Sequence, residues 1–187
     1  MNTIQGIDHG ILNFIQNNLQ FPMIDPIMIF ASTIGNNAAI WISIALLLML
    51  TKKYRSTGLM ITGALLLCLL IGNLTMKPYF ARIRPFHVFT DIVLLIKSPT
   101  DFSFPSGHTM TSFASATILL LKNKRWGIWA IGLASLIAFS RMYLFVHYPS
   151  DIVVGLLIGI AIAIFIEKIA TIINNKHNRN TNNSPKY

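Results

Sequence analysis

The sequence predicts an all-α integral membrane protein: a compact bundle of five or six transmembrane helices with an amphipathic N-terminal segment. Of its 187 residues, 53% are hydrophobic and only 11% are charged. The mean hydropathy is +0.60. The apolar residues fall in long blocks, which is typical of membrane spans and not of soluble helices.

The N-terminal segment has the pattern of a helix lying on the membrane surface. Polar side chains at His9, Asn13, Gln16 and Asn17 oppose an apolar stripe, although Asp8 interrupts that stripe. The stripe consists of Ile4, Ile7, Ile11, Phe14, Ile15 and Leu19. This spacing predicts an amphipathic helix on the outer surface of the bilayer. Residues 1–20 contain no Lys or Arg and no compact apolar core, so we expect no signal peptide.

Residues 21–34 allow two interpretations because they are apolar but short and contain Asp25 and Pro26. If they lie at the interface, 35–37 forms a turn before the first span, and the chain crosses five times with its N-terminus outside. If they cross, there are six spans and Asp8 is cytoplasmic.

Five apolar blocks follow, at 38–50, 58–75, 109–121, 126–140 and 152–173. Several are shorter than the ~20 residues of a full span, so flanking residues must extend them. The single cysteine, Cys68, lies inside a block, which excludes an intramolecular disulfide and indicates a small buried hydrophobic residue. We expect residues 1–175 to form one membrane domain and the polar residues 176–187 to be a disordered cytoplasmic tail.

The formal net charge of +9 comes from basic residues between the blocks, chiefly in turns 52–55 and 122–125. They form no stripe and accompany no nucleic-acid motif, so nucleic acid is not an expected partner. Loops rich in Lys and Arg are typically cytoplasmic. That orientation places three further polar segments together on the extracytoplasmic face of the inner or plasma membrane.

The first polar segment contains Lys77, Arg84 and Pro85. A lysine and an arginine that reach one point suit a phosphoryl group, because Arg binds oxygens in a planar fork and Lys acts as a mobile point charge. The alternative is a pair of cations that extend to the lipid interface. For Arg82, in the same loop, contact with lipid headgroups is the better interpretation.

The second segment is Pro105-Ser106-Gly107-His108, at the entry to an apolar helix. Free amides at a helix start bind anions, and Gly107 lets the backbone approach an oxyanion. Ser106 suits either a phosphate oxygen or a helix cap, and His108 could protonate a leaving oxygen. The alternative is a plain serine cap beside an interfacial histidine.

The third segment contains Ser140, Arg141, His147 and Asp151. The four-residue spacing lets the carboxylate of Asp151 reach one ring nitrogen of His147 and raise the basicity of the other. The alternative makes Asp151 only an acidic residue in the first turn of a helix.

Together the segments match K-x6-R-P, P-S-G-H and S-R-x5-H-x3-D without departure, and this signature resembles that of the type 2 phosphatidic acid phosphatase superfamily. The resemblance covers about residues 38–173. It implies that His147 attacks phosphorus to form a phosphohistidine, that Asp151 orients it, and that His108 is the general acid. Lys77, Arg84, Arg141, Ser106 and the Gly107 amide would bind the phosphoryl oxygens. No metal and no cofactor is implied.

Family resemblance and topology favour undecaprenyl pyrophosphate as the substrate. Alternatives are phosphatidylglycerophosphate, phosphatidate or a lipid A phosphate, or transfer of the phosphoryl group to another lipid. A vanadate haloperoxidase or a membrane transporter fits the sequence less well. We expect the loop 86–104 to set specificity, with 93–96 dipping into the interface and Lys97 contacting a second phosphate. The oligomeric state stays open.

Overall fold

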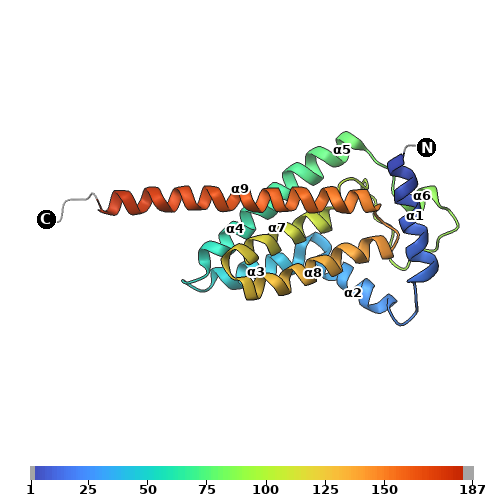
Figure 1. Cartoon of the computed structure of the whole chain (residues 1–187), viewed down its shortest axis with the longest axis horizontal. Coiled ribbons are helices and arrows are strands. Elements are labelled where there is room, and N and C mark those ends of the chain that lie inside the picture. The colour runs from blue at the N-terminus through green and yellow to red at the C-terminus, as the bar shows by residue number, and fades with distance from the viewer. Residues whose placement is uncertain (1–2, 183–187) are drawn as a thin grey trace.

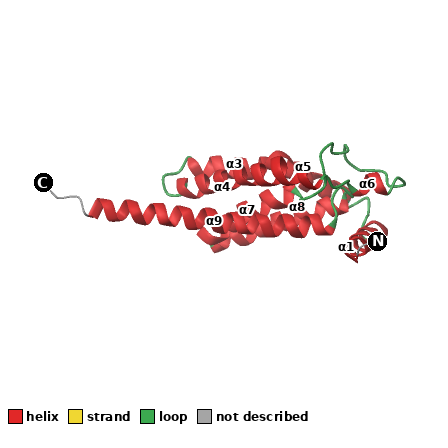
Figure 2. Cartoon of the chain, turned by 90° about the horizontal axis from the view of Figure 1, so that it is seen from above, coloured by secondary structure: helices red, strands yellow, loops and turns green. Residues whose placement is uncertain are grey.

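The computed structural model describes residues 3–182, and within that range every regular element is a helix (Figures 1 and 2). The predicted all-α membrane fold is therefore confirmed. The elements are α1 (Thr3–Asn18), α2 (Asp25–Gly35), η1 (Asn36–Ala38), α3 (Ala39–Met49), α4 (Arg55–Cys68), the π-helical η2 (Leu69–Met76), α5 (Lys77–Phe80), α6 (Pro85–Val88), α7 (Gly107–Lys122), α8 (Lys124–Tyr143) and α9 (Pro149–Asn182).

The first rod of the bundle is broken in its middle. Helices α2 and α3 together form the apolar stretch Asp25–Met49. They are joined through Asn37 (φ 51°) and Ala38 (φ 57°), both in left-handed conformation. Left-handed residues interrupt the helical hydrogen-bond ladder and bend the rod without reversing it. Residues 25–34 therefore lie in one rod with α3, and the turn expected at 35–37 is a kink within that rod.

Within the described residues the helices form five rods along the bundle: α2–α3, α4–α5, α7, α8 and α9. Three rods are long and apolar enough to span a membrane: Asp25–Met49, Arg55–Val88 and Pro149–Lys176. Helix α7 packs against α4, α8 and α9 and is largely buried. The buried indole of Trp41 donates to the Ser112 hydroxyl at 2.8 Å, which links α3 to α7.

Helices α7 and α9 touch backbone to backbone. A Cβ on Gly155 would lie 2.8 Å from the Ser106 carbonyl oxygen, and one on Gly159 would lie 2.4 Å from that of Met110. Small residues four apart permit this approach between membrane helices. The contact fixes the start of α9 beside the start of α7.

Helix α1 lies across one end of the bundle (Figure 2). The predicted amphipathic helix forms. Asp8, which interrupts the apolar stripe, faces the bundle together with Leu12 and Ile15, and all three residues are buried. Much of the apolar stripe points outward, with Ile4 64% and Phe14 58% exposed. The apparent interruption of the stripe is thus the part of α1 that docks on the bundle.

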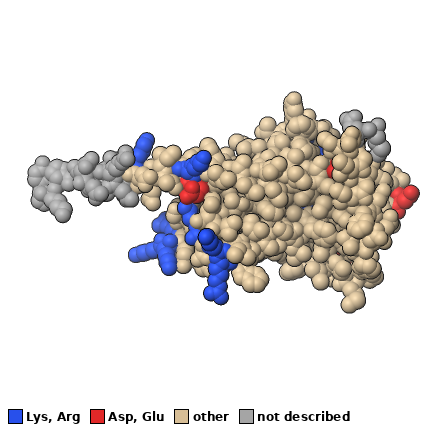
Figure 3. Space-filling model, in the orientation of Figure 1, with Lys and Arg blue, Asp and Glu red and all other residues tan. Residues whose placement is uncertain are grey.

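The two ends of the bundle differ in charge. On the face shown in Figure 3, Lys and Arg gather at the end where α9 projects, while the middle is almost free of charge. The exposed basic residues at that end lie in the α3–α4 turn and at the adjoining start of α4, at the junction of α7 and α8, and on α9 at Lys168 and Lys176. Helix α9 continues through 176–182, where we predicted a disordered tail, since adding residues to an existing helix is easier than starting one. Residues 183–187 of that tail lie outside the described range.

Candidate active site

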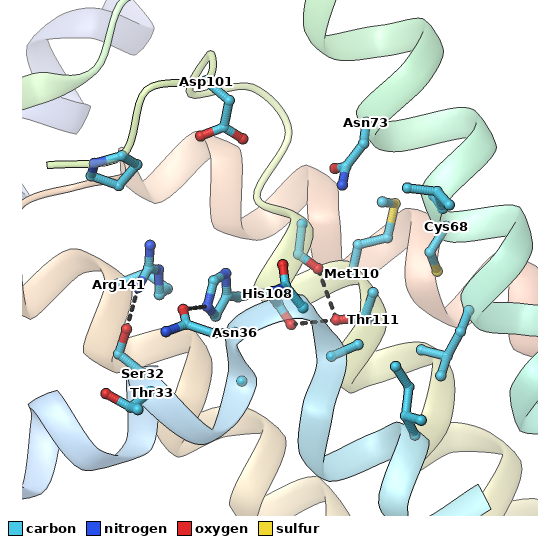
Figure 4. Close-up of a pocket in the computed structure, with 18 of the residues that line it drawn as sticks. Ser32, Thr33, Asn36, Cys68, Asn73, Asp101, His108, Met110, Thr111 and Arg141 are labelled. Atoms are coloured by element: carbon cyan, nitrogen blue, oxygen red, sulfur yellow. Dashed lines mark hydrogen bonds between the residues drawn. The ribbon is translucent and has the colours of Figure 1, made fainter. Parts of the chain in front are cut away.

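The three polar segments meet at the end of the bundle opposite the basic turns. Six of the predicted site residues line one cavity of about 1110 Å³. They are Lys77, Arg84, Gly107, His108, Arg141 and His147. The other two, Ser106 and Asp151, are fully buried beside the cavity. Figure 4 labels two of the six cavity residues, His108 and Arg141.

Local backbone structure brings Lys77 and Arg84 to the same place. The π-helical turns of Leu69–Met76 end at Lys77, and Ala81 (φ 44°) then terminates α5. The chain runs extended to Arg84, and Pro85 begins α6. Both cations are buried, with Lys77 7% and Arg84 3% exposed. Buried cations of this kind require anionic partners.

Asp101 supplies that anion. Its carboxylate pairs with the ammonium of Lys77 and accepts from Nη2 of Arg84 at 2.7 Å. Partial burial opposes ionisation, but the hydrogen bonds and charges of Lys77 and Arg84 hold the pKa of Asp101 well below its usual range. Asp101 lies in the loop 86–104 that we expect to set specificity, and no local pattern links it to Lys77 and Arg84, which are 24 and 17 residues away.

Arg84 also joins the first segment to the third. Its Nη1 donates to the Val146 carbonyl at 2.6 Å and lies 3.2 Å from Nε2 of His147. Its Nε donates to the backbone oxygen of Asp101 at 2.8 Å. Bonds on all sides of the guanidinium hold it in one orientation toward the cavity.

His147 presents its two ring nitrogens to different surroundings. Nδ1 lies 3.4 Å from Oδ2 of Asp151, whereas Nε2 faces the cavity and Arg84. Oδ2 of Asp151 also accepts from the Tyr148 amide at 2.9 Å and from the Ser103 hydroxyl. Burial, followed by the charges of Arg84, Arg141 and Lys77, holds the pKa of His147 well below its ordinary value. The imidazole is therefore neutral, with a lone pair available on Nε2 if Nδ1 carries the proton.

Arg82 does not have the position that we predicted. It does not extend to lipid headgroups but donates to Oδ1 of Asp151 at 2.5 Å and to Oδ2 of Asp8 at 2.7 Å. Its guanidinium lies 4.0 Å from the ring centroid of Tyr148. Asp8 also accepts from the Ser150 amide at 2.9 Å. Two buried carboxylates compensate the cost of burying Arg82, so helix α1 is bonded to the back of the site.

The kinked first rod contributes polar groups that sequence reasoning missed. Nη1 of Arg141 donates to the Ser32 hydroxyl, and Asn36 Oδ1 lies 3.0 Å from Nε2 of His108 (Figure 4). Ser106, by contrast, caps α7, since its hydroxyl accepts from the Thr109 amide at 3.4 Å and from the Thr109 hydroxyl at 3.0 Å. The cap was the alternative interpretation of Ser106.

The loop before α7 borders the cavity. Lys97 lines its rim together with Thr100 and Asp101. In the segment expected to dip into the interface, Leu94 packs on the protein core while Val93 is 86% exposed. Among residues 3–176, whose side chains the structure describes, no group of three or more His, Cys, Asp and Glu is arranged to hold a metal ion.

Comparisons with known proteins agree with this geometry. A family profile described as the PAP2 superfamily matches residues 56–174. An undecaprenyl-diphosphatase of Sulfolobus acidocaldarius is 33% identical over 145 residues, which are 76% of this chain and 69% of the relative. A lipid A 4'-phosphatase of Porphyromonas gingivalis is 33% identical over 169 residues, covering 82% and 69% of the two chains.

The fold is also that of a solved structure. The crystal structure of Aquifex aeolicus LpxE superposes with a TM-score of 0.77 at 27% identity, covering 87% of this chain and 95% of that one. With the matching family profile and the apolar spans, this shows that the chain belongs to the PAP2 superfamily and is a membrane phosphatase acting on lipid phosphates.

Proposed function

We propose that the protein hydrolyses a lipid pyrophosphate, undecaprenyl pyrophosphate in the first instance, through a phosphohistidine on His147. The observation that carries this proposal is the carboxylate of Asp101, which bridges Lys77 and Arg84 in the cavity that Nε2 of His147 faces. An anion thus already lies where two cations and the imidazole converge. A phosphoryl group would replace the carboxylate with a more highly charged anion in the same bonds.

The shape of the cavity supports a lipid substrate. From the polar end it continues between α3 and α4, where each helix presents an apolar-rich stripe at helical spacing. The stripes are Ile42, Ala45, Leu46 and Met49 on α3 and Thr62, Leu65 and Leu66 on α4, which Leu69 of η2 continues. At the far end Gly58 closes the gap, since a Cβ there would lie 2.6 Å from the Ala45 carbonyl oxygen. A long apolar tail would fit this groove while its phosphate lies in the polar end.

The proposed reaction has two steps. Nε2 of His147 attacks phosphorus while the bond to the leaving oxygen breaks, and His108 gives that oxygen a proton. Water then attacks the phosphohistidine, His108 takes its proton, and the phosphorus–nitrogen bond breaks to release inorganic phosphate. Lys77, Arg84, Arg141 and the Gly107 amide would stabilise the charge on the phosphoryl oxygens. Asp151 would hold the proton on Nδ1 so that Nε2 is the nucleophile.

The preference for a pyrophosphate rests on the Sulfolobus relative and on Lys97. Lys97 lies on the rim of the same cavity, where it could contact a second phosphate. Phosphatidylglycerophosphate, phosphatidate and lipid A phosphates are the competing substrates, and the lipid A 4'-phosphatase relative supports the last of them. Replacing Lys97 by Ala should therefore reduce the preference for diphosphate over monophosphate lipids. An unchanged preference would leave Lys97 without this role.

Phosphate release by the purified protein in detergent with EDTA is the direct test. Wild type and His147→Ala would be compared on undecaprenyl pyrophosphate, phosphatidylglycerophosphate, phosphatidate and a lipid A phosphate, with His87→Ala, an exposed histidine, as the control. Release that survives EDTA, persists in His87→Ala and is lost in His147→Ala is expected. Full activity of His147→Ala would exclude the phosphohistidine, and a phosphorylated lipid acceptor in place of free phosphate would indicate a transferase.

We also infer that the site faces the extracytoplasmic side and the basic turns face the cytoplasm. The only cysteine, Cys68, is buried, so introduced cysteines can be labelled against a low background. In intact cells an impermeant maleimide should label Ser98→Cys and not Lys53→Cys. Labelling of Lys53→Cys and not Ser98→Cys would show that the site faces the cytoplasm.

A further inference from the structure

The imidazole of His108 lies against the kink between α2 and α3 (Figure 4). This kink precedes the residues 56–174 that the family profile matches. Its Nε2 is 3.0 Å from Oδ1 of Asn36. An amide oxygen only accepts hydrogen bonds, so this contact places a proton on Nε2.

Gly35 makes the contact sterically feasible. A Cβ on Gly35 would lie 2.9 Å from Cδ2 of His108 and 3.0 Å from Cγ2 of Ile137. The Cδ2–Nε2 edge of the ring therefore packs against the kink, with the backbone of Gly35 beneath it. The opposite edge of the ring carries Nδ1, the nitrogen left for the substrate.

The backbone holds Asn36 in place. Its amide donates to the Thr33 carbonyl at the end of α2, and its own φ and ψ of −57° and 133° lie outside the helical range. The next two residues are both left-handed. In a straight helix the side chain of residue 36 would point in another direction around the helix axis. The kink instead directs it toward His108 at the start of α7.

We propose that Asn36 is a positioning residue for the general acid, which it serves by holding the proton on Nε2 of His108 so that Nδ1 delivers the catalytic proton. The inference rests on the proposed function. In the first step the ring, cationic beside the bound phosphate, gives its Nδ1 proton to the leaving oxygen as the phosphorus–oxygen bond breaks, while the other proton stays on Nε2, which donates to Oδ1 of Asn36. The neutral ring then has its lone pair on Nδ1, where it accepts the proton of the attacking water.

The proposal predicts a dependence on the leaving group. An alkoxide from a lipid monophosphate is the most basic leaving group and depends most on the proton, whereas nitrophenolate, or the phosphate monoester released from a lipid diphosphate, depends on it less. General acids typically contribute 10²–10⁴-fold, and loss of orientation should remove part of that. In Asn36→Ala we expect kcat on phosphatidate to fall about 10–100-fold, while kcat on 4-nitrophenyl phosphate and on undecaprenyl pyrophosphate falls less than about 3-fold.

The experiment uses the full chain in detergent with these three substrates and two further variants. Asn36→Asp keeps an acceptor oxygen and should keep the ratio of kcat values near that of wild type, whatever its charge does to KM. Thr33→Val is the control for disturbance of α2, since the Thr33 hydroxyl bonds only its own helix, to the Ile29 carbonyl at 2.7 Å.

Equal losses on all three substrates in Asn36→Ala would make Asn36 merely structural and overturn the proposal. Unchanged rates would overturn it as well. A wild-type protein that hydrolyses none of the three would instead contradict the proposed function, so the two failures can be told apart.

Discussion

The two ends of the bundle use the same kinds of side chain in opposite ways. At the basic end, Lys122 and Glu167 form a partly exposed pair at 3.1 Å, with their side chains 33% and 28% exposed. At the site end, Arg82 lies between Asp8 and Asp151, whose side chains are 2% and 0% exposed. At the basic end, water can solvate either Lys122 or Glu167 in place of its partner. At the site end, water reaches neither Asp8 nor Asp151. Charge at the basic end therefore suits orientation in the membrane, and charge at the site end suits chemistry.

The largest expected difference between the ends is in turnover. Asp151→Asn should lower kcat by about 10²–10⁴-fold, because the amide no longer holds the proton on Nδ1 of His147. Glu167→Gln is the matched acid-to-amide change at the other end and should alter kcat less than 2-fold. Phosphate release from the best lipid measures both, and similar losses in the two variants would erase the distinction.

The second difference should appear in stability. Arg82→Leu leaves two buried carboxylates without their cation and should lower the free energy of unfolding by about 3–5 kcal/mol. Lys122→Leu breaks the exposed pair and should change it by at most about 1 kcal/mol. Unfolding in detergent, followed by circular dichroism, tests the pair. A small effect of Arg82→Leu would mean that water reaches Asp8 and Asp151.

The third prediction concerns pH and His147. Because the pKa of His147 is lowered in the folded protein, the unfolded chain binds its proton first as the pH falls. This contribution to stability is complete above the unfolded value of about 6.5 and is lost as the pH falls from there toward the folded value. The thermal midpoints of wild type and His147→Gln should run parallel from pH 8 to 7, and wild type should then fall more steeply toward pH 5. Parallel curves throughout would show that the histidine is solvated.

The smallest effect is expected at Asp101, a half-exposed anion between buried cations. Asp101→Asn should free Lys77 and Arg84 and tighten inhibition by inorganic phosphate about 3–10-fold, because the ligand no longer displaces a bound carboxylate. Asp91→Asn, in the same loop and exposed, is the control. Weaker binding of phosphate in Asp101→Asn would mean that the carboxylate orients the cations instead of competing for them.

The sequence was most informative where function depends on short spacings. His147 and Asp151 are four residues apart, and one helix start brings them together. Lys77, His108 and Arg141 were predicted to share a site, and they line one cavity because the spans place their segments at one end. The apolar blocks predicted the rods of the bundle, with boundaries that differ by several residues.

What the sequence could not give depends on contacts between distant segments. Asp8 lies 74 residues from Arg82, and Asn36 lies 72 residues from His108. No local pattern encodes such pairs. The kink at Asn37 and Ala38 was also missed, since left-handed alanine has no sequence signal and asparagine only a weak one. The break in the apolar stripe at Asp8 was a usable signal, because a carboxylate on the inward side of a helix needs a partner.

The π-helical turns at Leu69–Met76 have a consequence for how this family can change over time. Such turns hold one residue more than the α-helix they interrupt. Loss of one residue there would restore ordinary helical bonding without rotating Lys77, because the wider turn absorbs the extra residue. Loss of a residue from the α-helical part of the same span would instead rotate Lys77 by about 100° around the helix axis and remove a cation from the phosphate site. Among active relatives, single-residue gaps in the second span should accordingly fall within Leu69–Met76 and be rare in the rest of the span.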